Sequence, residues 1–183
     1  GVRAKAGIRT VQVAVWSAVG GQDDLIWYTA TYKSDGSFEV PINMANHKYT
    51  YGTYYAHAYV TDNNSVTVVA TGSVVINQPK ATITSAMNGN HTQATVKATG
   101  VVMPGGVRSV QIAVWSDAGG QNDLVWYQGS HYGGNTWGVN VPIYNHATAG
   151  NYTVHVYAID GYGASHIVGT SKFAVEGPTS GMV

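Results

Sequence analysis

The stretch Val110-Gln-Ile-Ala-Val-Trp-Ser116 predicts a β-strand, because aliphatic residues occupy every second position in a run rich in β-branched residues. A period of two places Val110, Ile112 and Val114 on one face of a strand. A nearly identical stretch, Val11-Gln-Val-Ala-Val-Trp-Ser17, lies 99 residues earlier. The chain therefore holds two copies of a strand with one apolar face.

Other blocks recur in the same order, so the whole module is duplicated. Gly20–Tyr28 returns as Gly119–Tyr127, and Gly52-x-Tyr54-x-x-His57-x-Tyr59-x-x-Asp62 returns as Gly150-x-Tyr152-x-x-His155-x-Tyr157-x-x-Asp160. The join lies near Asn77-Gln-Pro79, where proline and polar residues interrupt the apolar pattern. We expect a first repeat over residues 1–77, a second over 78–177, and a linker or tail over 178–183.

The second copy predicts seven short strands, with a turn signal at Asn88-Gly-Asn90 between the first two. This spacing indicates an all-β chain of two tandem immunoglobulin-like or fibronectin-type-III-like sandwiches. Tyr152 and Tyr54 each stand where a tyrosine corner would place a buried ring with its hydroxyl bonded to nearby backbone. We expect strands over residues 81–87, 92–101, 108–116, 124–130, 136–142, 152–160 and 166–175.

The first copy is short at its front. Ile8 aligns with Val107, and nothing before Ile8 matches the first two strands of the second copy. We expect a first repeat without its N-terminal strands, in which Val11, Val13 and Val15 face a gap. A neighbouring chain or the linker between the copies would cover that gap, because a bare apolar sheet face promotes aggregation. The alternative is a first copy that closes its sandwich differently.

Composition excludes several classes of protein. Hydrophobic residues make up 44% of the chain, which is enough for a core, while charged residues make up only 10%. Nine basic residues balance nine acidic ones, which argues against nucleic-acid binding and against docking on anionic lipid. No apolar run is long enough to insert in a membrane, and the absence of cysteine removes disulfides and thiolate chemistry.

No arrangement of residues predicts an enzyme, a metal site or a cofactor. Glycoside hydrolysis needs two placed carboxylates, and most of the nine acids lie in turns. Asp24 and Asp123 lie in a repeated loop, where bonding to their own backbone is favoured over calcium ligation. His47 and His146 follow asparagine in loops and belong to no cluster with metal-ligand spacing.

The face opposite the apolar one carries large aromatic rings. Core positions at Val110, Ile112 and Val114 direct Trp115 to the other side, and core Val154 and Val156 do the same for the residues between them. Because aromatic rings beside hydrogen-bonding groups suit the apolar face and the hydroxyls of a sugar, we expect a glycan platform. Its candidate residues are Gln111, Trp115, Tyr127, His155 and Tyr157 in the second copy, and Trp16, Tyr28, His57 and Tyr59 in the first.

A structural role for these rings stays open. Trp115 ends its strand, so the loop at residues 117–122 could cover it. Trp126 and Tyr127 point to opposite faces, so one of them belongs to the core. Single exposed hydrophobic residues are also common on proteins that bind nothing there.

The repeated blocks resemble the GBS Bsp-like repeat of streptococci, lactobacilli and their phages. The matching motifs are V-x-x-A-V-W-S, G-G-Q-[DN]-D-L-x-W-Y, N-H and G-x-Y-x-x-H-x-Y-x-x-D. They cover most of the second copy, and the first copy from Ile8 onward. The resemblance implies an accessory repeat of secreted bacterial cell-wall proteins, many of which are peptidoglycan hydrolases or phage lysins with a separate catalytic domain.

From the rings and the resemblance together we expect a non-catalytic module that binds cell-wall polysaccharide or peptidoglycan and so targets or orients an exported enzyme or another surface protein. Two weak sites on one chain would combine by avidity on a polymer. The alternatives are a passive spacer between catalytic and targeting domains, and a protein–protein interaction module.

Overall fold

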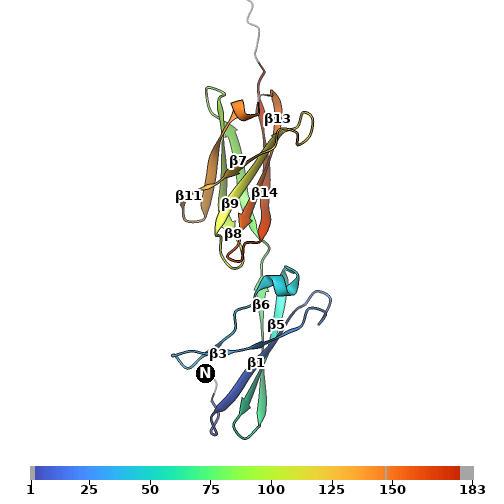
Figure 1. Cartoon of the computed structure of the whole chain (residues 1–183), viewed down its shortest axis with the longest axis vertical. Helices are drawn as coiled ribbons and strands as arrows, with labels where there is room; N and C mark the ends of the chain where they lie inside the picture. Colours follow the sequence, from blue (N-terminus) through green and yellow to red (C-terminus); the bar gives the residue numbers. More distant parts are fainter. Residues whose placement is uncertain (1–2, 147, 178–183) are drawn as a thin grey trace, which may run out of the picture. The chain divides into compact units, whose positions relative to one another are not determined.

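The structure, a computed structural model, describes residues 3–146 and 148–177. It divides into two compact units that meet between Gln78 and Pro79, and each is described by itself (Figure 1). The tail expected over residues 178–183 lies outside the described residues.

The second repeat is a sandwich of two antiparallel four-stranded sheets. One sheet has the order β10-β9-β13-β14 and the other has the order β11-β12-β8-β7. This arrangement confirms the immunoglobulin-like or fibronectin-III-like fold predicted from strand spacing. The strands are β7 (Lys80–Met87), β8 (Gln93–Val102), β9 (Ser109–Ser116), β10 (Val125–Gln128), β11 (Ser130–Gly133), β12 (Thr136–Pro142), β13 (Gly150–Ile159) and β14 (Ser165–Val175).

One predicted strand, over residues 124–130, is two strands in the structure. β10 pairs with β9 in one sheet, whereas β11 pairs with β12 in the other. Gly129 lies between them, and its backbone N–H donates to the Val110 carbonyl at 2.8 Å. The chain therefore changes sheets at this glycine, which the alternation pattern alone did not reveal.

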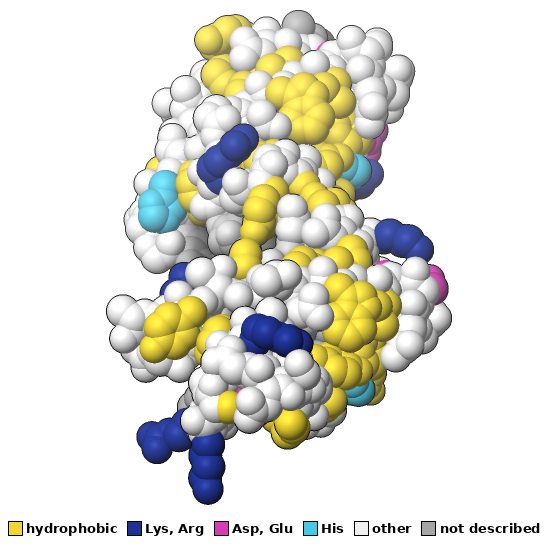
Figure 2. All heavy atoms as spheres, turned by 60° about the horizontal axis from the view of Figure 1, so that its bottom comes forward, with side chains coloured by type: hydrophobic (Ala, Val, Ile, Leu, Met, Phe, Trp, Pro, Cys, Tyr) yellow, Lys and Arg dark blue, Asp and Glu magenta, His cyan; other side chains and the backbone are white. Residues whose placement is uncertain are grey.

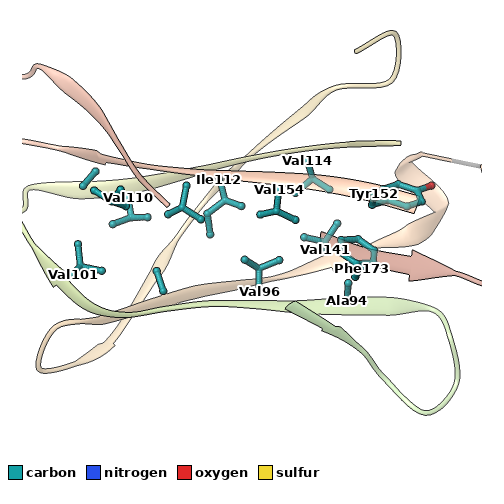
Figure 3. Close-up of a cluster of buried hydrophobic side chains, with 14 of the residues drawn as sticks. Ala94, Val96, Val101, Val110, Ile112, Val114, Val141, Tyr152, Val154 and Phe173 are labelled. Carbon is teal, nitrogen blue, oxygen red and sulfur yellow. The ribbon is translucent and has the colours of Figure 1, made fainter. Parts of the chain in front are cut away.

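The core of the second repeat lies between the two sheets, where the side chains of Val110, Ile112 and Val114 are fully buried (Figure 3). Val154 and Val156 extend this layer from β13, and Val96 faces it from β8. Burial of such aliphatic side chains contributes roughly 1.5 to 3 kcal/mol each, which makes this layer the main source of stability. The inward parity predicted for β9 and β13 is confirmed.

Both tyrosine corners are present. The ring of Tyr152 is fully buried, and its hydroxyl donates to the Thr148 carbonyl at 2.6 Å. In the first repeat Tyr54 is 1% exposed and its hydroxyl donates to the Thr50 carbonyl at 2.7 Å. Each bond ties the start of a core strand to the loop before it.

The first repeat has one full sheet and one small hairpin. The sheet has the order β2-β1-β5-β6, and the hairpin pairs β3 with β4. Among the described residues, no strand corresponds to β7 or β8, which confirms the predicted loss of the N-terminal strands. The elements are β1 (Ile8–Ser17), β2 (Ile26–Thr29), β3 (Thr31–Tyr32), β4 (Phe38–Glu39), β5 (Gly52–Asp62) and β6 (Thr67–Ile76).

The gap in the first repeat differs in part from the expected one. Val11 and Val15 are buried, at 4% and 3% exposure, and Val13 is half-buried. Val68 and Val74 on β6 are instead open to solvent, at 61% and 59% exposure. The face is therefore most exposed along β6, while Val13 and Val15 of β1 line the same open groove, as expected.

Helical structure in the described part of the chain is limited to two short 3₁₀ turns, η1 (Met44–His47) and η2 (Ile143–Asn145). Neither is long enough to cross a membrane, and no other described segment forms a candidate membrane helix. The first turn ends at the buried His47, and the second ends directly before the buried His146.

Candidate functional site

The candidate site is the outer face of the β10-β9-β13 sheet. Strand register places Trp126 opposite Ala113, and Ala113 opposite His155. Two residues further along each of these strands, Gln111 lies opposite Tyr157. These side chains therefore share the face that points away from the core, as predicted for Gln111, His155 and Tyr157.

Aromatic rings form a continuous row across this face. Ring centroids are 5.2 Å apart for Trp126 and Tyr157, 6.3 Å for Tyr157 and His155, and 4.8 Å for His155 and Trp115. The first two contacts are tilted, and the last is edge-to-face. Such geometries are the favoured ones for aromatic pairs, so the row is a packed unit rather than four separate rings.

The two ends of the row differ in their exposure to solvent. Trp126 is 52% exposed, whereas Trp115 is only 8% exposed. The expectation that Trp115 offers an open ring is therefore wrong, although its position on the outer face is right. The rings of Trp115 and His155 pack edge-to-face, so the buried Trp115 ring holds this end of the row in place.

The first repeat carries the two corresponding ring pairs. Trp27 is 52% exposed and lies 5.0 Å from Tyr59, while Trp16 is buried and lies 4.7 Å from His57. Tyr55 adds a further ring 5.8 Å from Trp16. As in the second repeat, the candidate Trp16 is a buried support and not a platform.

Tyr127 and Tyr28 do not belong to the outer face. Tyr127 pairs with Ile112 and packs against the core, so its predicted place in the platform is wrong. The same holds for Tyr28, which packs against the core of the first repeat. The residues that sequence reasoning missed are their neighbours Trp126 and Trp27, which alternation within the short strand would have placed correctly once its register with β9 was known.

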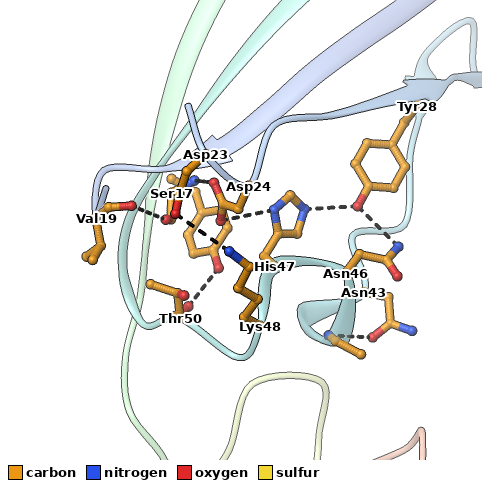
Figure 4. Close-up of polar contacts among 12 residues, drawn as sticks. Ser17, Val19, Asp23, Asp24, Tyr28, Asn43, Asn46, His47, Lys48 and Thr50 are labelled. Atoms are coloured by element: carbon orange, nitrogen blue, oxygen red, sulfur yellow. Dashed lines mark hydrogen bonds and ion pairs between the residues drawn. The ribbon is translucent and has the colours of Figure 1, made fainter. Parts of the chain in front are cut away.

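Tyr28 belongs instead to a buried polar network (Figure 4). Its hydroxyl lies 2.9 Å from Nε2 of His47, and Nδ1 of His47 lies 3.4 Å from Oδ2 of Asp24. Asp24 Oδ1 accepts from the backbone N–H of Ser17 at 2.9 Å. His47 is fully buried and Asp24 is 6% exposed, whereas Tyr28 at the other end of the network is half-buried.

The second repeat rebuilds this network from equivalent residues. The Tyr127 hydroxyl lies 3.0 Å from Nε2 of His146, and Nδ1 of His146 lies 3.1 Å from the Asp123 carbonyl oxygen. Asp123 Oδ1 accepts from the backbone N–H of Ser116 at 2.9 Å. Each aspartate thus closes the loop after its strand by bonding backbone seven residues earlier, and each has a histidine partner that the sequence pattern did not indicate.

The charge state of Asp24 follows from these contacts. Burial acts to raise its pKa, but the hydrogen bonds from Ser17 and the nearby His47 outweigh burial, and the pKa lies below the ordinary value. The network therefore holds an ionised carboxylate at the end of the sandwich. Its burial and its repetition in both copies indicate a structural role.

Hydrogen-bonding groups rather than charges surround the aromatic row. Gln111 and Gln12 are exposed beside it. A charged pair lies near the Trp115 end, where Lys172 Nζ lies 2.9 Å from Asp117 Oδ2 and Thr153 donates to Asp117 Oδ1 at 2.6 Å. Hydrogen bonds from Thr153 and Lys172 lower the pKa of Asp117. In the view of Figure 2, Lys and Arg side chains are scattered over a surface that is otherwise mostly hydrophobic or uncharged.

Within the described ranges, no three histidine or acidic side chains lie close enough together to hold a metal ion. The aromatic rings and the glutamine amides of the outer face are groups that stack and form hydrogen bonds.

A complete sandwich of immunoglobulin-like or fibronectin-III-like topology in the second repeat, and a partial one with corresponding aromatic pairs in the first, define the chain as a repeat module. The chain belongs to the GBS Bsp-like repeat family, whose model matches residues 1–74 and 83–173. Both repeats are thus members, including the one that lacks its first strands. No curated protein sequence matches the chain.

Several solved structures are similar to the chain at low sequence identity. A tetra-tandem repeat from the extending region of a large adhesion protein matches 91% of this chain at 17% identity, with a TM-score of 0.42. A two-domain fibronectin type III segment of chicken tenascin matches 94% at 16% identity, also with a TM-score of 0.42. A putative polysaccharide deacetylase from Bacillus anthracis matches 55% at 15% identity, with a TM-score of 0.41. The chain spans 42% of the adhesion-protein structure, 87% of the tenascin segment and 31% of the deacetylase.

Proposed function

We propose that the chain is a non-catalytic module that binds the glycan of the bacterial cell wall and so targets or orients an exported protein, such as a peptidoglycan hydrolase. The outer faces of the two repeats are the binding surfaces. Membership of the repeat family is consistent with this role, because the resemblance implies an accessory repeat of cell-wall proteins.

One observation carries the proposal: an open tryptophan lies on a tyrosine at the same place in both repeats. Trp126 contacts Tyr157 and Trp27 contacts Tyr59, and each tryptophan is 52% exposed. Exposed indole rings cost solubility, and a pair of them at matching sites is explained by a ligand that both contact. A sugar ring stacks on an indole through its apolar face and leaves its hydroxyls to nearby amides.

The polar surroundings favour an uncharged stretch of glycan. Gln111 and Gln12 offer amide donors and acceptors beside the rings, and the Lys172 and Asp117 charges at the Trp115 end are paired with each other. A single stacked ring gives modest affinity, so two sites on one chain would act together on a polymer.

The test is sedimentation of the full chain with purified cell walls, before and after removal of accessory polysaccharide. The wild type should pellet with walls, and the double variant Trp27→Ala with Trp126→Ala should remain in solution. The control variant Tyr144→Ala with Tyr162→Ala removes two aromatic residues of 81% and 60% exposure outside the row and should pellet like the wild type.

The outcomes separate the competing functions. A wild-type chain that never pellets would overturn wall binding and leave a passive spacer. The chain could also pellet with walls that have lost their polysaccharide but still carry protein, and not with walls that have lost both. That outcome would point to a protein partner.

A further inference from the structure

The inner face of the first repeat is open where the second repeat is closed. Val74 and Phe173 occupy the same register position, opposite Tyr54 and Tyr152 respectively. Phe173 is 8% exposed and stacks on Tyr152, but Val74 is 59% exposed. The first repeat thus has an apolar strand face that its own described residues do not cover.

This face forms an apolar groove. It encloses about 310 Å³ and is lined mainly by aliphatic side chains of β1, β6 and the segment after β4. Its lining includes Val13 and Val15 of β1, Val40 and Ile42 of the segment after β4, and Val74 of β6. An apolar groove of this kind next to a strand edge is suited to a further piece of sheet.

The second repeat shows what fills the corresponding space. Strand β8 faces the core there, with Ala94, Val96 and Ala98 fully buried, and β7 pairs with β8 and packs against β14, where Ser85 Oγ lies 2.9 Å from Ser171 Oγ. β12 pairs with β8 over six residues, from Trp137–Ala98 to Pro142–Gln93. In the first repeat the counterpart of β12 is the two-residue β4, which pairs only with β3.

A shared turn shows how such a strand would join the first repeat. The Gly7 N–H donates to the Ala4 carbonyl at 3.1 Å, and the Gly106 N–H donates to the Met103 carbonyl at 3.2 Å. Both glycines have left-handed backbone, with φ of 78° and 82°. In the second repeat this turn follows directly after β8.

The surroundings of the two turns also correspond. A hollow beside the first turn is lined by Arg3, Ala4, Ile8 and Phe38. Its counterpart is lined by Val102, Met103, Val107 and Trp137, in matching order. Arg3 therefore occupies the position of Val102, the last residue of β8.

We propose that the inner face of the first repeat binds a β-hairpin of the β7–β8 type, with the end of its second strand next to the Ala4–Gly7 turn. The inward side chains of this hairpin are small and aliphatic, as in β8, and alternate with outward threonine or lysine. It pairs with the free edge of β4 and buries Val74. A second copy of this chain is a poorer occupant, because its own hairpin already closes its second repeat.

The test grafts the chain's own hairpin onto the first repeat. Residues 79–102 are placed directly before Ala4 in the full chain, so that Val102 takes the position of Arg3. The graft should raise the melting temperature of the first repeat and slow hydrogen exchange of the β6 amides. An unchanged melting temperature with unchanged exchange would overturn the proposal.

Two adjacent valines provide the matched control. Val74 faces the groove and Val75 faces away, at 59% and 63% exposure. Val74→Asp and Val75→Asp should both leave the present chain nearly unaffected. In the grafted chain Val74→Asp should abolish the gain in melting temperature, and Val75→Asp should keep it. Equal effects of the two variants would contradict docking on this face.

A synthetic peptide of residues 79–102 gives an independent reading that does not depend on folding of the graft. Added to the full chain, it should protect the β6 amides in a saturable way, and Val74→Asp but not Val75→Asp should prevent this. Absence of protection together with a dimer that Val74→Asp dissociates would overturn the hairpin and identify a second copy as the occupant.

Discussion

The indole of Trp126 packs at a tilt of 50° against the phenol ring of Tyr157, with 5.2 Å between the ring centroids, and Trp126 remains 52% exposed. At the other end of the same row, Trp115 meets His155 at 4.8 Å and is almost fully buried. One sheet face thus uses two tryptophans for different purposes. The buried ring fixes the row, and the open ring is available for contact.

This division predicts opposite results for two substitutions of the same type. Trp115→Ala should cost about 3 to 5 kcal/mol of unfolding free energy, because it leaves a cavity among packed rings. Trp126→Ala should cost within about 1 kcal/mol, as expected of a half-exposed residue. Chemical denaturation of the second repeat measures both, and similar losses for the two variants would contradict the assignment.

Alternation along a strand predicted most of this face but not its accessibility. Val110, Ile112 and Val114 fix the parity of β9, so Gln111 and Trp115 were placed correctly. Parity states which face a residue occupies and not what packs over it, so the burial of Trp115 could not be read from it. The four-residue strand β10 is shorter still, and its register comes from pairing Trp126 with Ala113, a contact across a loop that the sequence does not encode locally.

The tyrosine corner predicts a second measurable effect. Tyr152→Phe removes the hydroxyl that donates to the Thr148 carbonyl and leaves the ring in place. The loss should be about 1 kcal/mol or somewhat more, since a buried acceptor loses its partner. Urea unfolding of the second repeat gives the value, and Tyr54→Phe is the matched change in the first repeat. No loss in either repeat would show that the corner adds nothing to stability.

The buried network shows where sequence reasoning stopped. Both copies keep the aspartate, the Asn-His pair and the tyrosine, so the signal was present as repeated letters. Asp24 and His47 are 23 positions apart, however, and their contact depends on how a loop and a 3₁₀ turn meet at the end of the sandwich. Pattern alone gave neither residue a partner.

Acid should weaken the first repeat through Asp24. Its folded pKa lies below the ordinary 3.8, so ionised Asp24 adds stability that is complete above that value and is lost as the pH falls through the folded pKa. The melting temperature of the wild type should therefore drop more steeply below about pH 4 than that of Asp24→Asn. Differential scanning calorimetry across the acid range makes this comparison.

A neighbouring carboxylate controls for charge alone. Asp23 is exposed and lies 3.6 Å from the Lys48 ammonium, without contact to Ser17 or His47. Asp23→Asn should leave a steeper acid loss than Asp24→Asn does. If the two variants behave alike, the Ser17 and His47 contacts are not the source of the effect.

Alkali should act on the same end of the sandwich through Tyr54. Burial, followed by the nearby Asp24 carboxylate and the Tyr28 and Tyr51 hydroxyls, raises the pKa of Tyr54 to about 12. The neutral ring therefore adds stability that is complete below pH 10, the ordinary value, and is lost as the pH rises through about 12. Tyrosinate absorbance during an alkaline titration should show late-ionising groups, and Tyr54→Phe should remove one of them. The melting temperature of that variant should fall less between pH 10 and 12 than the melting temperature of the wild type. Burial raises the pKa of Tyr152 in the same direction, so the double variant with Tyr152→Phe should lose a second late group. Ionisation of both rings at their ordinary pKa, with the chain still folded, would contradict the burial of the corners.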